Sequence, residues 1–106
     1  MSGYTTPEGA ELSTAGGLNA TPITAATATD TVIKAAPGRL CRVLVTVTGT
    51  HAMVIWDNAS GHTGTIIGAL PANPAVGQVY DFQMPAAAGI TVQGDANNPG
   101  VTIGWS

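Results

Sequence analysis

Two histidines are the residues of this chain best suited to metal or proton chemistry. His51 and His62 each lie beside a predicted turn, and Asp57 lies between them in the sequence. Zinc requires three or four ligands in a tetrahedral array, and no cysteine pair or His-Glu spacing completes one. We therefore expect two exposed loop histidines and no metal. An ion shared between subunits at an interface is the alternative.

The candidate nucleophiles lack the groups that would activate them. Cys41 alternates with three valines, so we expect a small buried side chain. Ser60 and His62 are close in sequence, but no Gly-x-Ser-x-Gly turn and no orienting carboxylate accompany them. Glycoside hydrolysis needs two carboxylates across a cleft, whereas Asp57 and Asp95 stand where turns begin. The sequence predicts no enzyme, no catalytic residues and no cofactor.

The tryptophans are the remaining candidates for recognition. Aromatic side chains commonly anchor protein interfaces, and they also provide flat surfaces against which sugars stack. Trp56 and Trp105 are thus interpreted first as core or interface residues, and second as a glycan-stacking platform.

The elements that position these residues are predicted to be β-strands. From residue 31 onward, runs rich in Val, Ile and Thr alternate with Gly, Pro, Asn and Asp at intervals of about ten residues. The predicted strands are 31–35, 40–48, 52–57, 64–70, 78–84, 89–94 and 101–105. In the second of these, Cys41 and Val43 point to one face, and Leu40, Arg42 and Leu44 to the other. We therefore predict an all-β fold, in which residues 31–106 form a compact antiparallel β-sandwich that is jelly-roll-like.

Residues 1–30 differ in composition and show no hydrophobic period. Their larger apolar side chains are Tyr4, Leu12, Leu18 and Ile23, too few to offset the entropy of ordering the chain. We predict an extended or flexible N-terminal arm. It is either a tail without a task or a segment that orders on a partner through these four residues. Truncation of the arm is expected to leave the core folded.

The charge content argues for association with other protein. Only 8% of the 106 residues are charged, against about 25% in a typical soluble domain. Three basic residues are too few for nucleic acid, and no apolar run is long enough to cross a membrane. The N-terminus lacks a signal-peptide pattern, so synthesis in a cytoplasm is expected. The charged residues that normally block unwanted strand pairing at sheet edges are missing. This predicts assembly into a homo-oligomer or onto a larger surface. The candidate interface residues are Leu40, Arg42, Leu44, Trp56 and Trp105.

Six stretches carry a resemblance to a known class of proteins. They are Thr31-Val32-Ile33-Lys34, Gly38-Arg39-Leu40, Val54-Ile55-Trp56-Asp57-Asn58, Tyr80-Asp81-Phe82, Gly89-Ile90-Thr91-Val92 and Val101-Thr102-Ile103-Gly104-Trp105-Ser106. Their pattern resembles that of small virion proteins of tailed bacteriophages, which decorate the capsid or form the base of head fibres.

The resemblance implies a structural protein of the virion, located on the capsid surface and made in the host cytoplasm. It implies a trimer that binds the major capsid protein at local symmetry axes and stabilises the shell. The alternative function is a carbohydrate- or receptor-binding module of a fibre or tail, with a glycan as its partner.

Overall fold

The computed structural model describes residues 3–5, 11–13 and 15–106. Every regular secondary-structure element among these residues is a β-strand. The strands are β1 (Gly3–Thr5), β2 (Glu11–Ser13), β3 (Asn19–Ile23), β4 (Thr31–Lys34), β5 (Gly38–Val47), β6 (Met53–Asp57), β7 (Thr65–Leu70), β8 (Val79–Ala86), β9 (Ile90–Val92) and β10 (Gly100–Trp105). All seven predicted strands are present. Within these described residues, no helix is long and apolar enough to span a membrane.

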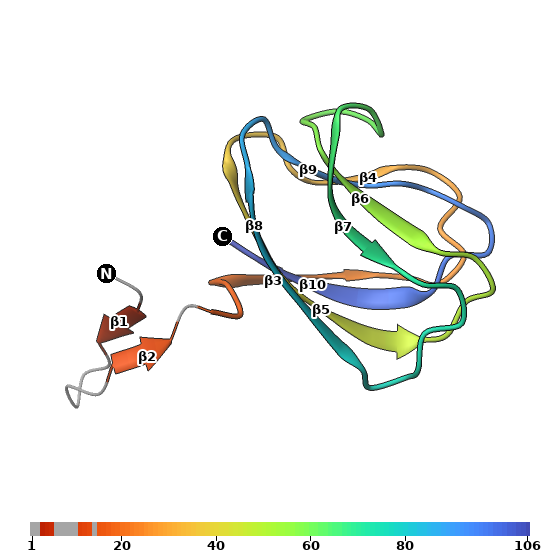
Figure 1. The fold of residues 1–106 in the computed structure, drawn as a ribbon, viewed down its shortest axis with the longest axis horizontal. Helices are drawn as coiled ribbons and strands as arrows, with labels where there is room; N and C mark the ends of the chain where they lie inside the picture. Colours follow the sequence, from red (N-terminus) through yellow and green to blue (C-terminus); the bar gives the residue numbers. More distant parts are fainter. Residues whose placement is uncertain (1–2, 6–10, 14) are drawn as a thin grey trace.

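Two four-stranded antiparallel sheets form the body of the molecule (Figure 1). The first sheet has the order β3-β10-β5-β8, and the second has the order β4-β9-β6-β7. β1 and β2 pair only with each other, as a separate two-stranded sheet. The prediction of an all-β, sandwich-like fold is confirmed.

The core lies between the two four-stranded sheets. Its fully buried side chains include Val43 and Val45 from β5, Met53 and Ile55 from β6, and Ile90 from β9. Alternation along each strand places these side chains on one face and leaves their neighbours on the outer face. Tyr80, Phe82 and Trp105 pack against this core while remaining partly exposed.

Leu40 is an exception to the predicted alternation. It was expected on the outer face as an interface residue, but its side chain has no exposed surface and belongs to the core. Gly104 is the register partner of Arg42, and Trp105 is the partner of Leu40, so one step along β10 spans two along β5. The extra residue, Cys41, forms a β-bulge that turns Leu40 inward. Leu40 is therefore a core residue and not an interface candidate.

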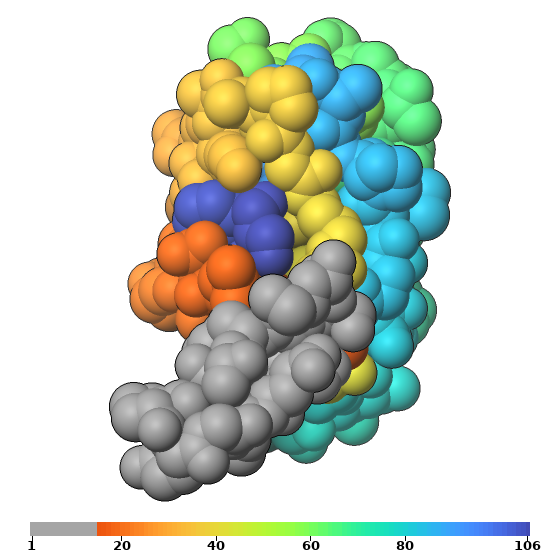
Figure 2. Space-filling view, turned by 90° about the vertical axis from the view of Figure 1, so that its left-hand side faces the viewer, coloured from red at the N-terminus to blue at the C-terminus, as the bar shows by residue number. Residues whose placement is uncertain are grey.

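The boundary predicted at residue 30 is also wrong. β3 lies within the predicted arm, yet it pairs along its whole length with β10 and completes the first sheet. Ile23 is only 5% exposed and belongs to the core, whereas Leu18 is 60% exposed. Figure 2 shows the orange surface of this segment lying directly against the dark blue C-terminal strand. The sandwich therefore includes at least residues 19–106.

Candidate functional site

The outer face of the first sheet is an almost uncharged surface. Register pairing aligns four exposed or partly exposed residues across all its strands, namely Pro22, Thr102, Leu44 and Val79. Leu44 is 38% exposed and Val79 is 55% exposed. A row of this composition is unusual for a solvated sheet face, which is normally polar.

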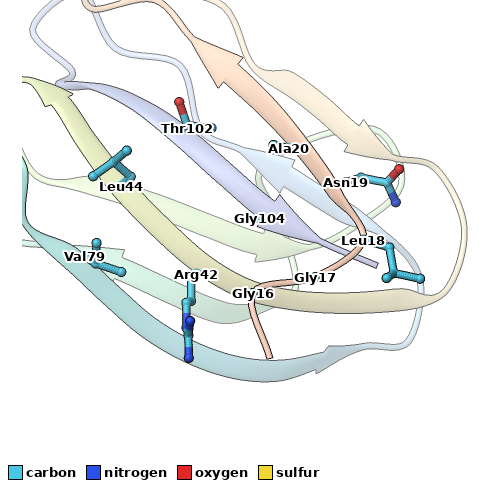
Figure 3. A pocket seen from close by; sticks show the side chains of 10 residues that line it. All are labelled: Gly16, Gly17, Leu18, Asn19, Ala20, Arg42, Leu44, Val79, Thr102 and Gly104. Carbon is cyan, nitrogen blue, oxygen red and sulfur yellow. The ribbon is translucent and has the colours of Figure 1, made fainter. Parts of the chain in front are cut away.

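A groove of about 430 Å³ runs over this face (Figure 3). Its lining residues are Gly16, Gly17, Leu18, Asn19, Ala20, Arg42, Leu44, Val79, Thr102 and Gly104. Leu44 and Val79 form its apolar side, and the segment that precedes β3 forms its opposite wall. Two of the predicted interface residues, Arg42 and Leu44, and one predicted arm residue, Leu18, therefore meet at one site.

Residues 15–18, which we call the strap, cross the outer face of the first sheet. The Gln83 Nε2 on β8 donates a hydrogen bond to the Ala15 carbonyl, and the Leu18 N–H donates to the Trp105 carbonyl over 3.1 Å. The strap thus runs from β8 across β5 and β10 and turns into β3.

Glycines permit this crossing. A Cβ on Gly104 would collide with the carbonyl oxygen of Gly16. A Cβ on Gly17 would lie 2.6 Å from the backbone of Trp105, and Gly17 has a φ of 87°, which favours glycine. Gly17 and Gly104 therefore let the backbone of the strap lie directly on the sheet surface, where it forms a wall of the groove.

Arg42 carries the single formal charge among the residues that line the groove. Its Nε lies 3.7 Å from the Asp81 Oδ1 on the neighbouring strand, and the two side chains are 45% and 55% exposed. An ion pair this long and this exposed contributes little to stability. The Arg42 guanidinium is therefore accessible to another carboxylate.

The second sheet also presents apolar side chains on its outer face. Val32, Thr91, Trp56 and Ile66 are aligned by register across β4, β9, β6 and β7. Val32 is 43% exposed and Ile66 is 50% exposed, while Trp56 is partly buried. Thr91 is fully buried, and its hydroxyl donates to the Asn58 carbonyl over 2.7 Å. Both sheets thus carry exposed hydrophobic residues on the side that faces away from the core.

The two tryptophans lie on different sheets. The Trp56 Nε1 donates to the Gln93 Oε1 over 3.0 Å. The Trp105 Nε1 donates to the Thr21 Oγ1 over 2.9 Å, and the ammonium of Lys34 lies 5.6 Å from the Trp105 ring centroid. This arrangement favours Trp105 as a residue at the edge of the core and Trp56 as a residue of the second outer face. It gives no support to a sugar platform shared by both rings.

The histidines form two separate pairs with aspartates. His62 Nδ1 lies 2.6 Å from Asp30 Oδ2, and His51 Nδ1 lies 3.0 Å from Asp95 Oδ1. Each imidazole is about half exposed. Each pair joins two loops of the sandwich, and no third metal-ligating side chain of the described residues comes close enough to either pair to form a group of three.

Backbone amides hold the pKa of both aspartates below its ordinary value. The Gly94 N–H donates to Asp30 and is the main cause of its lowered pKa, with His62 second. The Asn97 N–H is the main cause of the lowered pKa of Asp95, and His51 adds to it. These carboxylates are charged anchors for loops.

Asp57 fastens the β8–β9 turn to the end of β6. Its carboxylate accepts the N–H groups of Ala88 over 2.8 Å, Ala87 over 2.9 Å and Gly89 over 3.3 Å, and these lower its pKa. The prediction that Asp57 and Asp95 satisfy backbone amides at turns is confirmed. The thiol of Cys41 is buried, as its alternation with valines indicated.

The remaining predicted arm residues are Tyr4 and Leu12, which are register partners in the β1–β2 hairpin. The positions of their side chains lie outside the described part of the structure. The sequence did not single out Val79, Val32 or Ile66, because their exposure depends on which strands pair. A search of protein-family models, of curated proteins and of solved structures found no match to this chain.

Proposed function

We propose that this chain is a structural virion protein of a tailed bacteriophage, which decorates the capsid and stabilises it by bridging capsid subunits. The observation that carries the proposal is the presence of exposed apolar side chains on the outer faces of both sheets, Leu44 and Val79 on the first and Val32 and Ile66 on the second. Exposed apolar patches mark sites of interaction with other protein. Two such faces on one small sandwich suit a molecule that contacts one neighbour on each side.

The use of charge supports the same proposal. Asp30, Asp57 and Asp95 accept hydrogen bonds from loop amides, and none of the three belongs to the outer rows of the two sheets. Asp81 and Arg42 face each other on the same sheet. With so little charge on its faces, the chain is suited to bind uncharged protein surface.

The connectivity of the strands supports the virion interpretation. The orders β3-β10-β5-β8 and β4-β9-β6-β7 are consistent with a jelly roll, an architecture used by viral capsid and lectin domains. The resemblance of residues 31–106 to capsid decoration proteins implies the major capsid protein as the partner and a trimer as the bound form. A trimer gains affinity because its second and third contacts are effectively intramolecular.

The proposal is tested with capsid shells assembled without this chain. Purified chain is added to the shells, which are then sedimented and heated in a calorimeter. We expect saturable co-sedimentation and a raised Tm of the shell, because the chain binds the assembled shell and not its dissociated subunits. Ile66→Asp should weaken binding at least tenfold, and Val76→Asp, in an exposed loop, should not. Chain that stays in the supernatant at saturating concentration rejects the proposal.

A further inference from the structure

We infer that the groove on the first sheet binds residues 1–14 of a neighbouring copy of this chain. The inference concerns association of the free protein, so it goes beyond the proposed function and does not require a capsid. It commits the first sheet to contact with a second copy and leaves the second sheet for the shell.

The described chain begins again after this segment at an edge of its own sandwich. Ala15, the residue that follows the segment, lies at Gln83 on β8, which is an edge strand of the first sheet. The β1–β2 hairpin forms a sheet of its own, and Figure 1 shows it beyond the end of the sandwich. The segment would span about 46 Å if fully extended, and about half of that, roughly 23 Å, when it is folded back as a hairpin, which still exceeds the length of a six-residue strand of about 20 Å. The segment is therefore long enough to reach a neighbour.

The chemistry of the segment is complementary to that of the groove. Residues 1–14 contain Glu8 and Glu11 and no Lys or Arg, and their larger apolar residues are Met1, Tyr4 and Leu12. The groove presents Leu18, Leu44 and Val79, with Arg42 as the single charge of its lining. An acidic segment with a few apolar side chains suits an apolar groove that holds one cation.

The weak pairing of Arg42 strengthens this match. The Asp81 carboxylate reaches its Nε only at 3.7 Å and both groups are about half exposed, so little is lost when Arg42 turns to another carboxylate. Insertion of one copy's segment into the next copy's groove is a head-to-tail contact. Such contacts close into rings where the rotation allows, which is the geometry of a cyclic trimer.

Disulfide trapping between two differently sized copies tests the inference. A Leu12→Cys chain is mixed with a Val79→Cys chain that carries a size tag, and the mixture is oxidised mildly. The native thiol of Cys41 is fully buried, so the introduced thiols react first. We expect a mixed dimer of distinct mobility on a non-reducing gel. The control pairs Leu12→Cys with tagged Val32→Cys, whose position on the second sheet is 43% exposed, and should give at least fivefold less mixed dimer.

Three outcomes overturn the inference. They are the absence of mixed dimer, an equal yield with the Val32→Cys control, and an internal disulfide in a Leu12→Cys/Val79→Cys double variant that forms no mixed dimer. Sedimentation equilibrium gives a second measurement, in which Leu44→Glu lowers the mass toward 10.6 kDa and Val76→Glu does not. If the chain binds capsid shells but no mixed dimer is trapped, only this inference is rejected. If a mixed dimer is trapped but the chain does not bind shells, only the proposed function is rejected.

Discussion

Glycines at single positions allow two backbone segments of this chain to approach each other closely. Gly104 lies within β10, one residue before the end of the strand, and glycine is normally unfavourable inside strands. The reason for its presence is the strap, whose Gly16 carbonyl occupies the space that a side chain would need. The sequence shows that residue 104 is a glycine, but it does not show that the strap crosses the strand at this position.

Gly104→Ala should lift the strap from the sheet. We expect the free energy of unfolding to fall by about 1–3 kcal/mol, the usual effect of forcing extra volume into a packed site. The Leu18 amide, which donates to the Trp105 carbonyl, should exchange with deuterium faster. Gly61→Ala is the control, since a Cβ there would approach only the Asp30 carboxylate, at 4.0 Å. Unchanged exchange at Leu18 in Gly104→Ala would show that the strap does not depend on this contact.

Asp57→Asn should destabilise the protein in a manner that depends on pH. Asparagine replaces one carboxylate oxygen with an NH2 group, which cannot accept hydrogen bonds from the three amides. We therefore expect the free energy of unfolding to fall by about 1–2 kcal/mol at neutral pH. Because the folded pKa of Asp57 is lowered, its contribution is complete above the unfolded pKa of about 3.9 and is lost as the pH falls through the folded value. Urea unfolding from pH 7 to pH 2 should show the difference from wild type shrinking below about pH 4.

The matched control for this experiment is Asp81→Asn. Its carboxylate makes a long ion pair with Arg42 and accepts one hydrogen bond from Gln83, both exposed, so we expect a change of less than about 0.5 kcal/mol. A constant difference between Asp57→Asn and wild type across the whole pH range would mean that the charge of Asp57 does not hold the turn.

At the scale of elements, hydrophobic alternation predicted the seven strands from residue 31 onward and most of the core. It failed at two places for identifiable reasons. The bulge at Cys41 reverses the side on which Leu40 lies, and a bulge depends on the partner strand. β3 was missed because its sequence, Asn-Ala-Thr-Pro-Ile, has one large apolar residue. Its conformation depends on hydrogen bonds to β10 and not on local propensity.

Two truncations separate the contribution of the β1–β2 hairpin to stability from that of β3. Removal of residues 1–14 should change the free energy of unfolding by less than about 1 kcal/mol, because both four-stranded sheets stay complete. Removal of residues 1–30 should cost about 3 kcal/mol or more, because it exposes the partners of Ile23 and leaves β10 unpaired on one side. Urea unfolding of both variants measures this difference. Equal stabilities would contradict the place of β3 in the first sheet.

Leu40→Ala and Leu44→Ala test the bulge on one strand. The Leu40 side chain is fully buried, so its truncation should cost about 2–5 kcal/mol. Leu44 is 38% exposed on the outer face, and its truncation should cost less than about 1 kcal/mol in a monomer. Urea unfolding at a concentration low enough to dissociate oligomers gives both values, and a reversed order of the two would contradict the bulge.

For the whole molecule, composition predicted association, but it did not locate the surfaces. The sequence shows the low content of charged residues, and its alternation predicts that Arg42 and Leu44 point away from the core. The groove depends on register, which aligns Leu44 with Val79 and brings Leu18 to the same face. The outer row of the second sheet likewise unites residues from four strands that are far apart in sequence. Pairing between strands therefore creates both candidate surfaces.

Cryo-electron microscopy of phage particles whose genome encodes this chain would locate both outer faces of the sandwich in one measurement. We expect density for the sandwich on the outside of the shell, with the Val32 and Ile66 face against capsid protein and the Leu44 and Val79 face against another copy. Particles with a complete shell and no density for this chain would refute its proposed role in the virion, and so would density in which both faces are exposed to solvent.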